Sequence, residues 1–404
     1  VPNLRFPEFK GEWEKIIIDD LGDIVTGTTP PTNNHSNYGN EYLWASPADL
    51  GGVKYITDTK TKLSQLGFDR TRKIAKNSIL VTCIGSTIGK MGMASTNMCT
   101  NQQINSIIVN KNYDDNFVYY AINSRFPKYL SSVAMQAVPI ISKSAFEKLE
   151  NYTPKYEEQK KIGLFLSLID QRIENQSKII EKYESLIKGI GNKLFSLKMR
   201  FKTNDGNDFP SWKTKSFENI GKTFSGLSGK AKEDFGIGKP YIQYKQVFDS
   251  PQIQIQNCGL VNVSDSENQN NVKYGDVFFT VSSETPDEIG MSSVLLDEVD
   301  EMYLNSFCFG YRLSSFEVLS PLYASYFFRD SSFRNKVVKI AQGSTRYNIS
   351  KSELIKLEIS LPSIEEQARI ASFLSAVDEK IKNEKEILNL YLIQKSYLLR
   401  QMFI

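Results

Sequence analysis

Histidine is nearly absent from this chain of 404 residues, in which His35 stands alone. The four cysteines are far apart and include no Cys-x-x-Cys pair: Cys83, Cys99, Cys258 and Cys308. These scarcities exclude a zinc site with the usual ligand spacing and favour free thiols in a reducing compartment. His35 lies in a loop-like polar stretch without a partner nucleophile, which is more typical of a surface residue than of a general base.

Long hydrophobic runs are also absent, since no stretch approaches the ~18 apolar residues that a membrane span requires. The first residues lack the basic start and the apolar stretch of a signal peptide, so we expect a cytoplasmic protein with no membrane partner. The net charge of +3 is too small to indicate a nucleic-acid partner, because basic and acidic faces cancel in the sum.

The sequence contains no motif for the chemistry of phosphate or methyl transfer. It has no GxxxxGK(S/T) loop and no Asn-Pro-Pro-aromatic tetrad. Glu158 to Lys160 resembles part of a nuclease carboxylate-lysine motif, but these charges at a helix start suit the helix dipole equally well. We therefore expect a protein that is not catalytic by itself, with no metal site.

The chain contains an internal repeat. Residues Pro154 to Ile173 align without a gap on Pro362 to Ile381, 208 residues later. The same offset holds for Ile141 to Ser144, which matches Ile349 to Ser352, whereas Trp13 matches Trp212 at an offset of 199. The chain is thus one unit of about 200 residues written twice, with insertions between the matching segments.

Each repeat begins with short apolar runs bounded by Gly, Asn and Ser, which indicate strands of a compact α+β region. Each then ends in a long helix, announced by Pro154 or Pro362 and the acidic residues that follow. Ser363 and Glu366 match the capping-box pattern. We predict two globular domains at 1–153 and 200–361, and two long helices at 154–199 and 362–404.

Apolar residues with a 4,3 spacing predict that the two helices pack on each other as a coiled coil. At ~1.5 Å per residue each helix would be roughly 60 Å long. The second globular region must fit between them, so we expect the helices to be antiparallel, with Gln176 near Glu384. This polar pair either fixes the register of the seam or tilts toward solvent. The predicted seam residues are Ile162, Leu166, Ile169, Ile173, Gln176, Ile180, Ile370, Leu374, Val377, Ile381, Glu384 and Leu388.

The duplicated Pro-x-x-Glu-Glu-Gln-x-x-Ile-x-x-Phe-Leu-Ser helix, together with its preceding region, resembles the specificity subunit of type I restriction-modification systems. Weaker matches occur in the same order at Thr26 to Pro30, Ser86 to Lys90 and Thr100 to Gln103. The resemblance covers the full chain. It implies two target-recognition domains that each read half of a split double-stranded DNA site, with the helices fixing the gap. It also implies two methyltransferase subunits and two restriction-translocase subunits as partners, which would carry S-adenosylmethionine, ATP and magnesium.

Base edges are read by Arg, Lys, Asn and Gln, while hydroxyls and lysines hold phosphates. Such side chains lie in several loops, where hydroxyls beside glycine could also serve only to form turns. Arg346 lies in a polar loop, flanked by Gly343 and Tyr347. The matching stretch of the first half, Ala137 to Pro139, has a different sequence. The candidates for DNA contact are Thr28, Thr29, Ser86, Thr87, Lys90, Asn101, Gln102, Gln103, Lys230, Lys239, Tyr241, Gln243, Lys245, Ser282, Ser283, Ser344, Thr345 and Arg346.

Two functions explain the helices, and we favour the first. One is DNA recognition within a multisubunit enzyme, and the other is a coiled-coil scaffold whose globular regions bind protein without DNA specificity. Duplex binding that weakens with salt distinguishes them, because neutralised phosphates release counterions and a protein scaffold has no such dependence.

Overall fold

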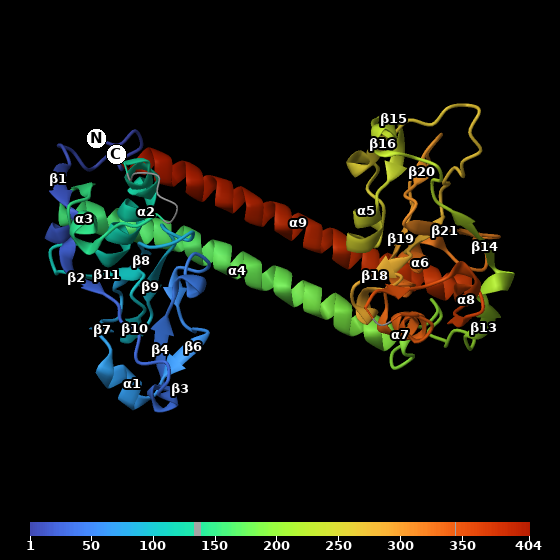
Figure 1. Cartoon of the computed structure of the whole chain (residues 1–404), viewed down its shortest axis with the longest axis horizontal. Coiled ribbons are helices and arrows are strands. Elements are labelled where there is room, and N and C mark those ends of the chain that lie inside the picture. Colours follow the sequence, from blue (N-terminus) through green and yellow to red (C-terminus); the bar gives the residue numbers. More distant parts are fainter. Residues whose placement is uncertain (133–138, 344) are drawn as a thin grey trace. The chain divides into compact units, whose positions relative to one another are not determined.

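The computed structural model describes residues 1–132, 139–343 and 345–404. The chain forms two compact units, and Figure 1 labels most of their helices and strands. Unit 1 comprises Val1–Ile180 and Glu384–Ile404, and unit 2 comprises Glu181–Asn383. The expected boundaries assigned each long helix to a segment of its own. In the structure, both long helices pass from one unit into the other, so each unit contains part of both.

Two five-stranded sheets form the globular part of unit 1, in the orders β2-β11-β8-β9-β5 and β3-β6-β4-β10-β7, and β1 pairs with β12. The strands are β1 Glu14–Ile17, β2 Gly22–Thr26, β3 Tyr38–Gly39, β4 Tyr42–Ala45, β5 Tyr55–Ile56, β6 Thr61–Leu63, β7 Lys73–Ile74, β8 Ile79–Thr82, β9 Met91–Ala94, β10 Met98–Thr100, β11 Ile104–Val109 and β12 Glu150–Thr153. The helices are α1 Gln65–Arg70, α2 Asp115–Ser132, α3 Lys143–Glu147 and the first part of α4 Tyr156–Phe195.

Unit 2 has the strand orders β14-β21-β17-β19 and β16-β15-β20, with the pairs β13-β23 and β18-β22. The strands are β13 Lys213–Ser216, β14 Gly221–Ser225, β15 Phe235–Ile242, β16 Gly259–Val261, β17 Val277–Thr280, β18 Ser282–Ser283, β19 Ser292–Val294, β20 Tyr303–Leu304, β21 Cys308–Leu313, β22 Tyr347–Asn348 and β23 Glu358–Leu361. The helices are α5 Tyr244–Asp249, α6 Pro321–Phe327, α7 Ser331–Lys339, α8 Lys351–Leu354 and the first part of α9 Ile364–Met402.

Strand β8 explains the apolar run in the middle of unit 1. Ile79 and Val81 point into the core formed with α2 and α4, whereas Leu80 points into a second core with Ile104. A strand buried on both faces has no polar alternation, so it reads as a continuous apolar segment. Strand β17 is equivalent in unit 2, where Phe279 and Phe278 enter different cores.

The helices α4 and α9 are antiparallel, as expected. Gln176 Nε2 donates to the main-chain oxygen of Glu384 at 3.0 Å and also to its carboxylate, and Lys395 Nζ pairs with Asp170 at 2.6 Å. Gln176 and Glu384 are both buried, so the alternative in which they tilt toward solvent is wrong. Among the predicted seam residues, Ile173, Val377 and Leu388 are half-buried and the others are buried.

The Glu-Glu-Gln motif at each helix start has a structural role that the sequence did not indicate. Glu158 and Glu366 are buried, and each carboxylate accepts two hydrogen bonds from one arginine, Arg5 in unit 1 and Arg200 in unit 2. The predicted capping box is therefore only half formed. Ser363 Oγ accepts from the Glu366 N–H at 3.3 Å, while the Glu366 carboxylate points to Arg200.

Each globular part is also fastened to its own long helix by a tyrosine and an aspartate. Tyr120 on α2 donates to Asp170 at 2.5 Å, and Tyr326 on α6 donates to Asp378 at 2.7 Å. Unit 1 adds Lys54, whose Nζ donates to Asn116 at 2.6 Å and to Ser167 Oγ at 2.8 Å. No helix among the described residues is long and apolar enough to cross a membrane.

This lysine gives unit 1 a testable dependence on pH. Burial lowers the pKa of Lys54 to about 8 from 10.5, and the nearby Asp170 carboxylate offsets only part of this effect. Above pH 8 the folded chain has released the proton that the unfolded chain still holds, so stability rises with pH up to about 10.5. We expect an increase on the order of 1 kcal/mol between pH 8 and 9.5, allowing for partial exposure.

Chemical denaturation of the full chain across this pH range measures the effect. In Lys54→Met, the Asn116 and Ser167 partners remain but the titrating amine is gone, so the rise should disappear. An equal rise in both proteins would assign it to other groups.

Candidate nucleic-acid interface

Three loops that are distant in the sequence of unit 1 adjoin at the ends of its strands. The Thr28 N–H donates to Thr100 O at 2.8 Å, and the Cys83 N–H donates to Gln103 O at 2.8 Å. The Thr29 hydroxyl donates to the side chain of Gln102. The structure therefore brings together the candidates of the first half that follow β2, β8 and β10.

Unit 2 builds the same framework with different side chains. The Leu227 N–H donates to Leu304 O at 2.7 Å, and the Val281 N–H donates to Phe307 O at 3.1 Å. These bonds correspond to those of Thr28 and Cys83, which makes Phe307 the structural equivalent of Gln103. We name these equivalent surfaces the loop faces: residues 27–29, 84–90 and 101–103 in unit 1, and residues 226–228, 282–290 and 305–307 in unit 2.

A close backbone approach explains one glycine in each loop face. A Cβ atom on Gly27 would lie 2.2 Å from Asn101 O, and one on Gly226 would lie 2.1 Å from Asn305 O. Both distances are far shorter than any side chain allows, so glycine is required where the two loops meet.

The structure argues against Asn101 as a reader of bases. Its side chain is buried, and its Oδ1 accepts from the Gln103 N–H at 3.0 Å. Asn305 makes the same bond to the Phe307 N–H at 2.8 Å. An asparagine that bonds to the backbone two residues later shapes a turn, so this repeated residue builds the loop rather than contacting DNA.

Three further candidates belong to a different part of unit 2. Tyr241 is buried in the small core beneath the β16-β15-β20 sheet, which contradicts a role in base contact. Lys230 pairs with Glu267 at 2.6 Å, and its side chain is only 6% exposed, which contradicts a free phosphate contact. Lys239 is exposed and pairs with Glu301 at 2.5 Å. The structure does not bring these residues together with Ser282 or Arg346.

The remaining candidates of unit 1 are accessible, and one arginine joins them. Four of them are exposed, namely Thr29, Ser86, Lys90 and Gln102. The other three are half-buried, namely Thr28, Thr87 and Gln103. The exposed Arg72 donates its backbone N–H to Thr28 Oγ1 at 3.0 Å and its guanidinium to Thr26 O at 3.0 Å. Sequence reasoning missed Arg72, although the basic run of residues 70–73 was a visible signal.

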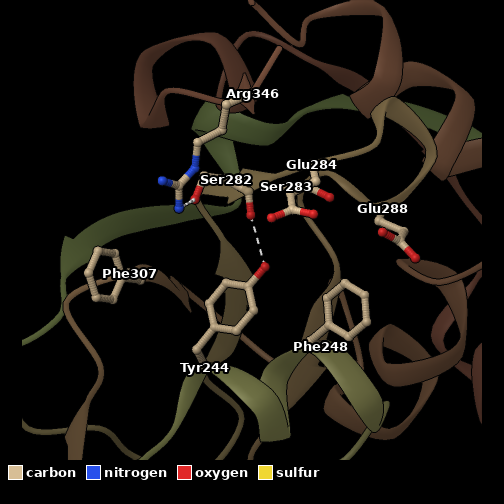
Figure 2. Close-up of a pocket in the computed structure, with 8 residues that line it drawn as sticks. All are labelled: Tyr244, Phe248, Ser282, Ser283, Glu284, Glu288, Phe307 and Arg346. Atoms are coloured by element: carbon tan, nitrogen blue, oxygen red, sulfur yellow. Dashed lines mark hydrogen bonds between the residues drawn. The ribbon is translucent and has the colours of Figure 1, made fainter.

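In unit 2 the loop face borders a pocket of about 430 Å³, shown in Figure 2. Tyr244 donates its hydroxyl to Ser282 O at 2.8 Å, and Arg346 Nη2 donates to Ser282 Oγ at 3.3 Å. Gln243 and Lys245 are exposed on either side of Tyr244, and Thr345 is exposed as well, whereas Ser344 lies outside the described residues. The pocket is lined by Tyr244, Phe248, Ser282, Ser283, Glu284, Glu288, Phe307 and Arg346.

Burial and charge within the pocket support hydrogen bonding rather than catalysis. Ser282 and Ser283 are buried in the β18-β22 pair, which leaves little of either hydroxyl for a ligand. Burial raises the pKa of the Tyr244 hydroxyl, which therefore remains protonated and acts as a donor. Within the described ranges, no cluster of His, Cys, Asp and Glu could hold a metal ion.

Two α+β units with duplicated loop faces and an antiparallel pair of long helices define the class of protein to which this chain belongs. A family model described as "Type I restriction modification DNA specificity domain" matches residues 10–185 and again residues 199–390, and the chain belongs to this family. The fold class and the family resemblance drawn from the sequence are thereby confirmed.

Curated relatives give the same result. The chain is 24% identical to the type I restriction enzyme MjaVIII specificity subunit of Methanocaldococcus jannaschii, over 97% of this chain and 94% of that protein. It is 33% identical to the HindI specificity subunit of Haemophilus influenzae over 174 residues. That second match covers 41% of this chain and spans only 38% of the relative's length.

Solved structures share the fold. The S subunit of the type I restriction-modification system from M. genitalium matches with a TM-score of 0.59 at 19% identity, over 100% of this chain and 99% of that one. A chain from a structure on complex assembly and conformational transition of the type I R-M system matches with a TM-score of 0.60 at 15% identity. It covers 97% of both chains.

Proposed function

We propose that this chain recognises a split sequence in double-stranded DNA, with each unit reading one half-site. The observation that carries this proposal is the pair of loop faces. They share one backbone framework, in which Thr28 corresponds to Leu227 and Gln103 to Phe307, but present different side chains. A repeated scaffold with unlike readers suits two unlike half-sites on one duplex.

The side chains of the loop face in unit 1 match the chemistry of a base edge. Gln102 offers an amide of the kind that pairs with adenine, and Thr29 and Ser86 offer hydroxyls. The Gln103 amide is instead bonded within the loop face, where its oxygen accepts from Asn101 and its nitrogen donates to Ile84 O. Arg72 and Lys90 supply positive charge for phosphates. The small net charge of +3 is compatible with DNA binding, because the sum over the whole chain does not report the charge of one face.

The chemistry would come from partners. By family membership we propose two methyltransferase subunits, which bind S-adenosylmethionine, and two restriction-translocase subunits, which use ATP and magnesium, with this chain non-catalytic by itself. Large apolar side chains exposed on the long helices of unit 1 support docking of protein there. They are Leu164 and Leu168 on α4, and Leu390, Ile393 and Tyr397 on α9.

The modified-base map of genomic DNA tests the proposal. Cells that supply the cognate methyltransferase subunit are compared with and without the gene for this chain. Methyladenine that appears only with the gene, at two unlike half-sites with a fixed gap, supports the proposal. Identical maps, with the chain folded and its partner present, would favour the alternative of a protein-binding scaffold.

Arg72 gives the proposal a residue-level test. We expect Arg72→Ala to weaken duplex binding about tenfold and to lower the slope of log K against log salt by about one, because one phosphate contact is lost. Fluorescence anisotropy with a labelled duplex at several salt concentrations measures both quantities.

Arg400→Ala provides the matched control. Arg400 is also exposed in unit 1 but lies on α9, so binding and slope should remain as in the wild type. Equal losses in both variants would show that Arg72 contributes only general positive charge.

A further inference from the structure

Three aromatic side chains line the pocket of unit 2. Tyr244 and Phe248 stack with ring centroids 6.1 Å apart and an interplanar angle of 18°. Phe307 is 61% exposed, although an aromatic ring of this size normally gains by burial. The equivalent residue in unit 1 is Gln103, so the aromatic ring is a particular feature of this loop face and not part of the shared framework.

The charges of the pocket are divided between its two sides. Figure 2 shows Arg346 on the side of Phe307, with Glu284 and Glu288 on the side of Phe248. The Thr285 hydroxyl donates to Glu288 at 2.7 Å, which holds that carboxylate in place. Two carboxylates repel a phosphate group, so the phosphate backbone fits only at the Arg346 rim. An uncharged group that donates hydrogen bonds fits the interior.

We infer that this pocket binds a single nucleobase that has left the duplex stack, and that the base is one with an exocyclic amino group. An aromatic-walled hollow of about 430 Å³ has room for a flat heterocycle, which would stack against Phe307 or Tyr244. Adenine, cytosine and guanine carry an exocyclic amino group on the pairing edge, whereas thymine does not, and a glutamate carboxylate accepts from such a group. Glu284 is the acceptor, and Arg346 holds the neighbouring phosphate.

This inference rests on the proposed DNA recognition and assigns a specific base-binding mode to unit 2. In the described part of unit 1, Gln103 takes the place of the exposed ring, and Lys90 corresponds to Met291 by the bonds from Thr82 and Thr280. The two half-sites should therefore differ in mechanism as well as in sequence. Only the half-site read by unit 2 should contain an unstacked base that is not a target of methylation.

Fluorescence of 2-aminopurine tests the unstacking. The probe is placed in turn next to each position of the mapped half-site of unit 2, so that the unstacked base keeps its own amino group, in a duplex bound by the chain with its methyltransferase subunits. We expect a several-fold increase beside one position other than the methylated adenine. Phe307→Gln, which places the unit 1 side chain in unit 2, should abolish this increase but not the one beside the methylated adenine.

Phe235→Gln is the matched control, since Phe235 is also an exposed aromatic residue of unit 2 but lies on β15. It should retain both signals. If only the probe beside the methylated adenine brightens, or if Phe307→Gln leaves the extra signal unchanged, the inference is wrong.

The methylation map tests the identity of the base. Glu284→Gln replaces an obligate acceptor with an amide that can donate, so discrimination at one position of this half-site should fall about tenfold, with the other half-site unchanged. Unchanged discrimination would overturn the assignment of Glu284. Failure of the proposed function looks different, because wild-type protein would then give no sequence-specific methylation at all.

Discussion

Replacing Arg200 with alanine is expected to lower the free energy of unfolding by about 3 kcal/mol. Arg200 donates to both oxygens of Glu366 at 3.0 and 2.6 Å, and Glu366 is fully buried. Without the guanidinium, this carboxylate keeps, among the described residues, the Trp212 indole N–H at 3.2 Å and its place at the start of α9. A buried charge that loses its partner costs more than the pair itself contributes, because its desolvation is no longer compensated.

Urea denaturation of the full chain measures the change, and two variants interpret it. Lys202→Ala removes an exposed cation two residues away and should alter stability by less than about 0.5 kcal/mol. Arg200→Ala combined with Glu366→Gln removes the buried charge and should recover part of the loss. If Arg200→Ala and Lys202→Ala have the same small effect, the ion pair is not a structural element of unit 2.

The repeat, the long helices and their antiparallel seam were predictable from the sequence because their signals are periodic. Residues such as Leu166 and Ile370 recur at a 4,3 spacing, and both are buried where the pattern places them. The polar pair of Gln176 and Glu384 followed from the constant offset of 208 residues between the repeats. Periodicity reports burial directly, so these features needed no knowledge of the tertiary structure.

The equivalence of the two loop faces could not be predicted, because it depends on backbone hydrogen bonds between segments distant in the chain. Gln103 and Phe307 are 204 positions apart and chemically unlike, so neither the offset of 208 nor residue similarity relates them. The buried carboxylates were missed for a similar reason. Glu158 looks like a dipole charge until Arg5, 153 positions earlier, is placed beside it.

Candidate DNA contacts were chosen by residue type, and the structure separates them by environment. Lys230 and Lys90 are the same residue type, and each was chosen as a phosphate contact. The Lys230 side chain is buried against Glu267, whereas Lys90 is exposed beside the turn after β8. Arg72 shows the converse error, since a basic residue outside the chosen loops reaches the loop face through Thr28. Side-chain chemistry alone does not determine which groups are accessible to a ligand.

Lengthening both long helices by one heptad is expected to abolish methylation at the original gap and to create a site with a longer one. Seven residues add about 10 Å of helix, which corresponds to about three base pairs of DNA. Insertions after Ile180 in α4 and after Lys380 in α9 preserve the Gln176–Glu384 layer and the 4,3 spacing on both sides. Both half-sites should remain unchanged, because no residue of either loop face is altered.

The longer gap should also be methylated more slowly than the original. Three base pairs rotate one half-site by about 100° around the DNA axis. Seven residues of α-helix complete almost two full turns, so the two ends of the inserted heptad differ by only about 20° of rotation around the helix axis. The duplex must twist to meet both loop faces, and that deformation reduces affinity. Insertion into α4 alone is the control, since it takes the seam on the unit 2 side out of register and should abolish methylation at every gap. An unchanged gap in the double insertion would show that the helices do not set the distance between the half-sites.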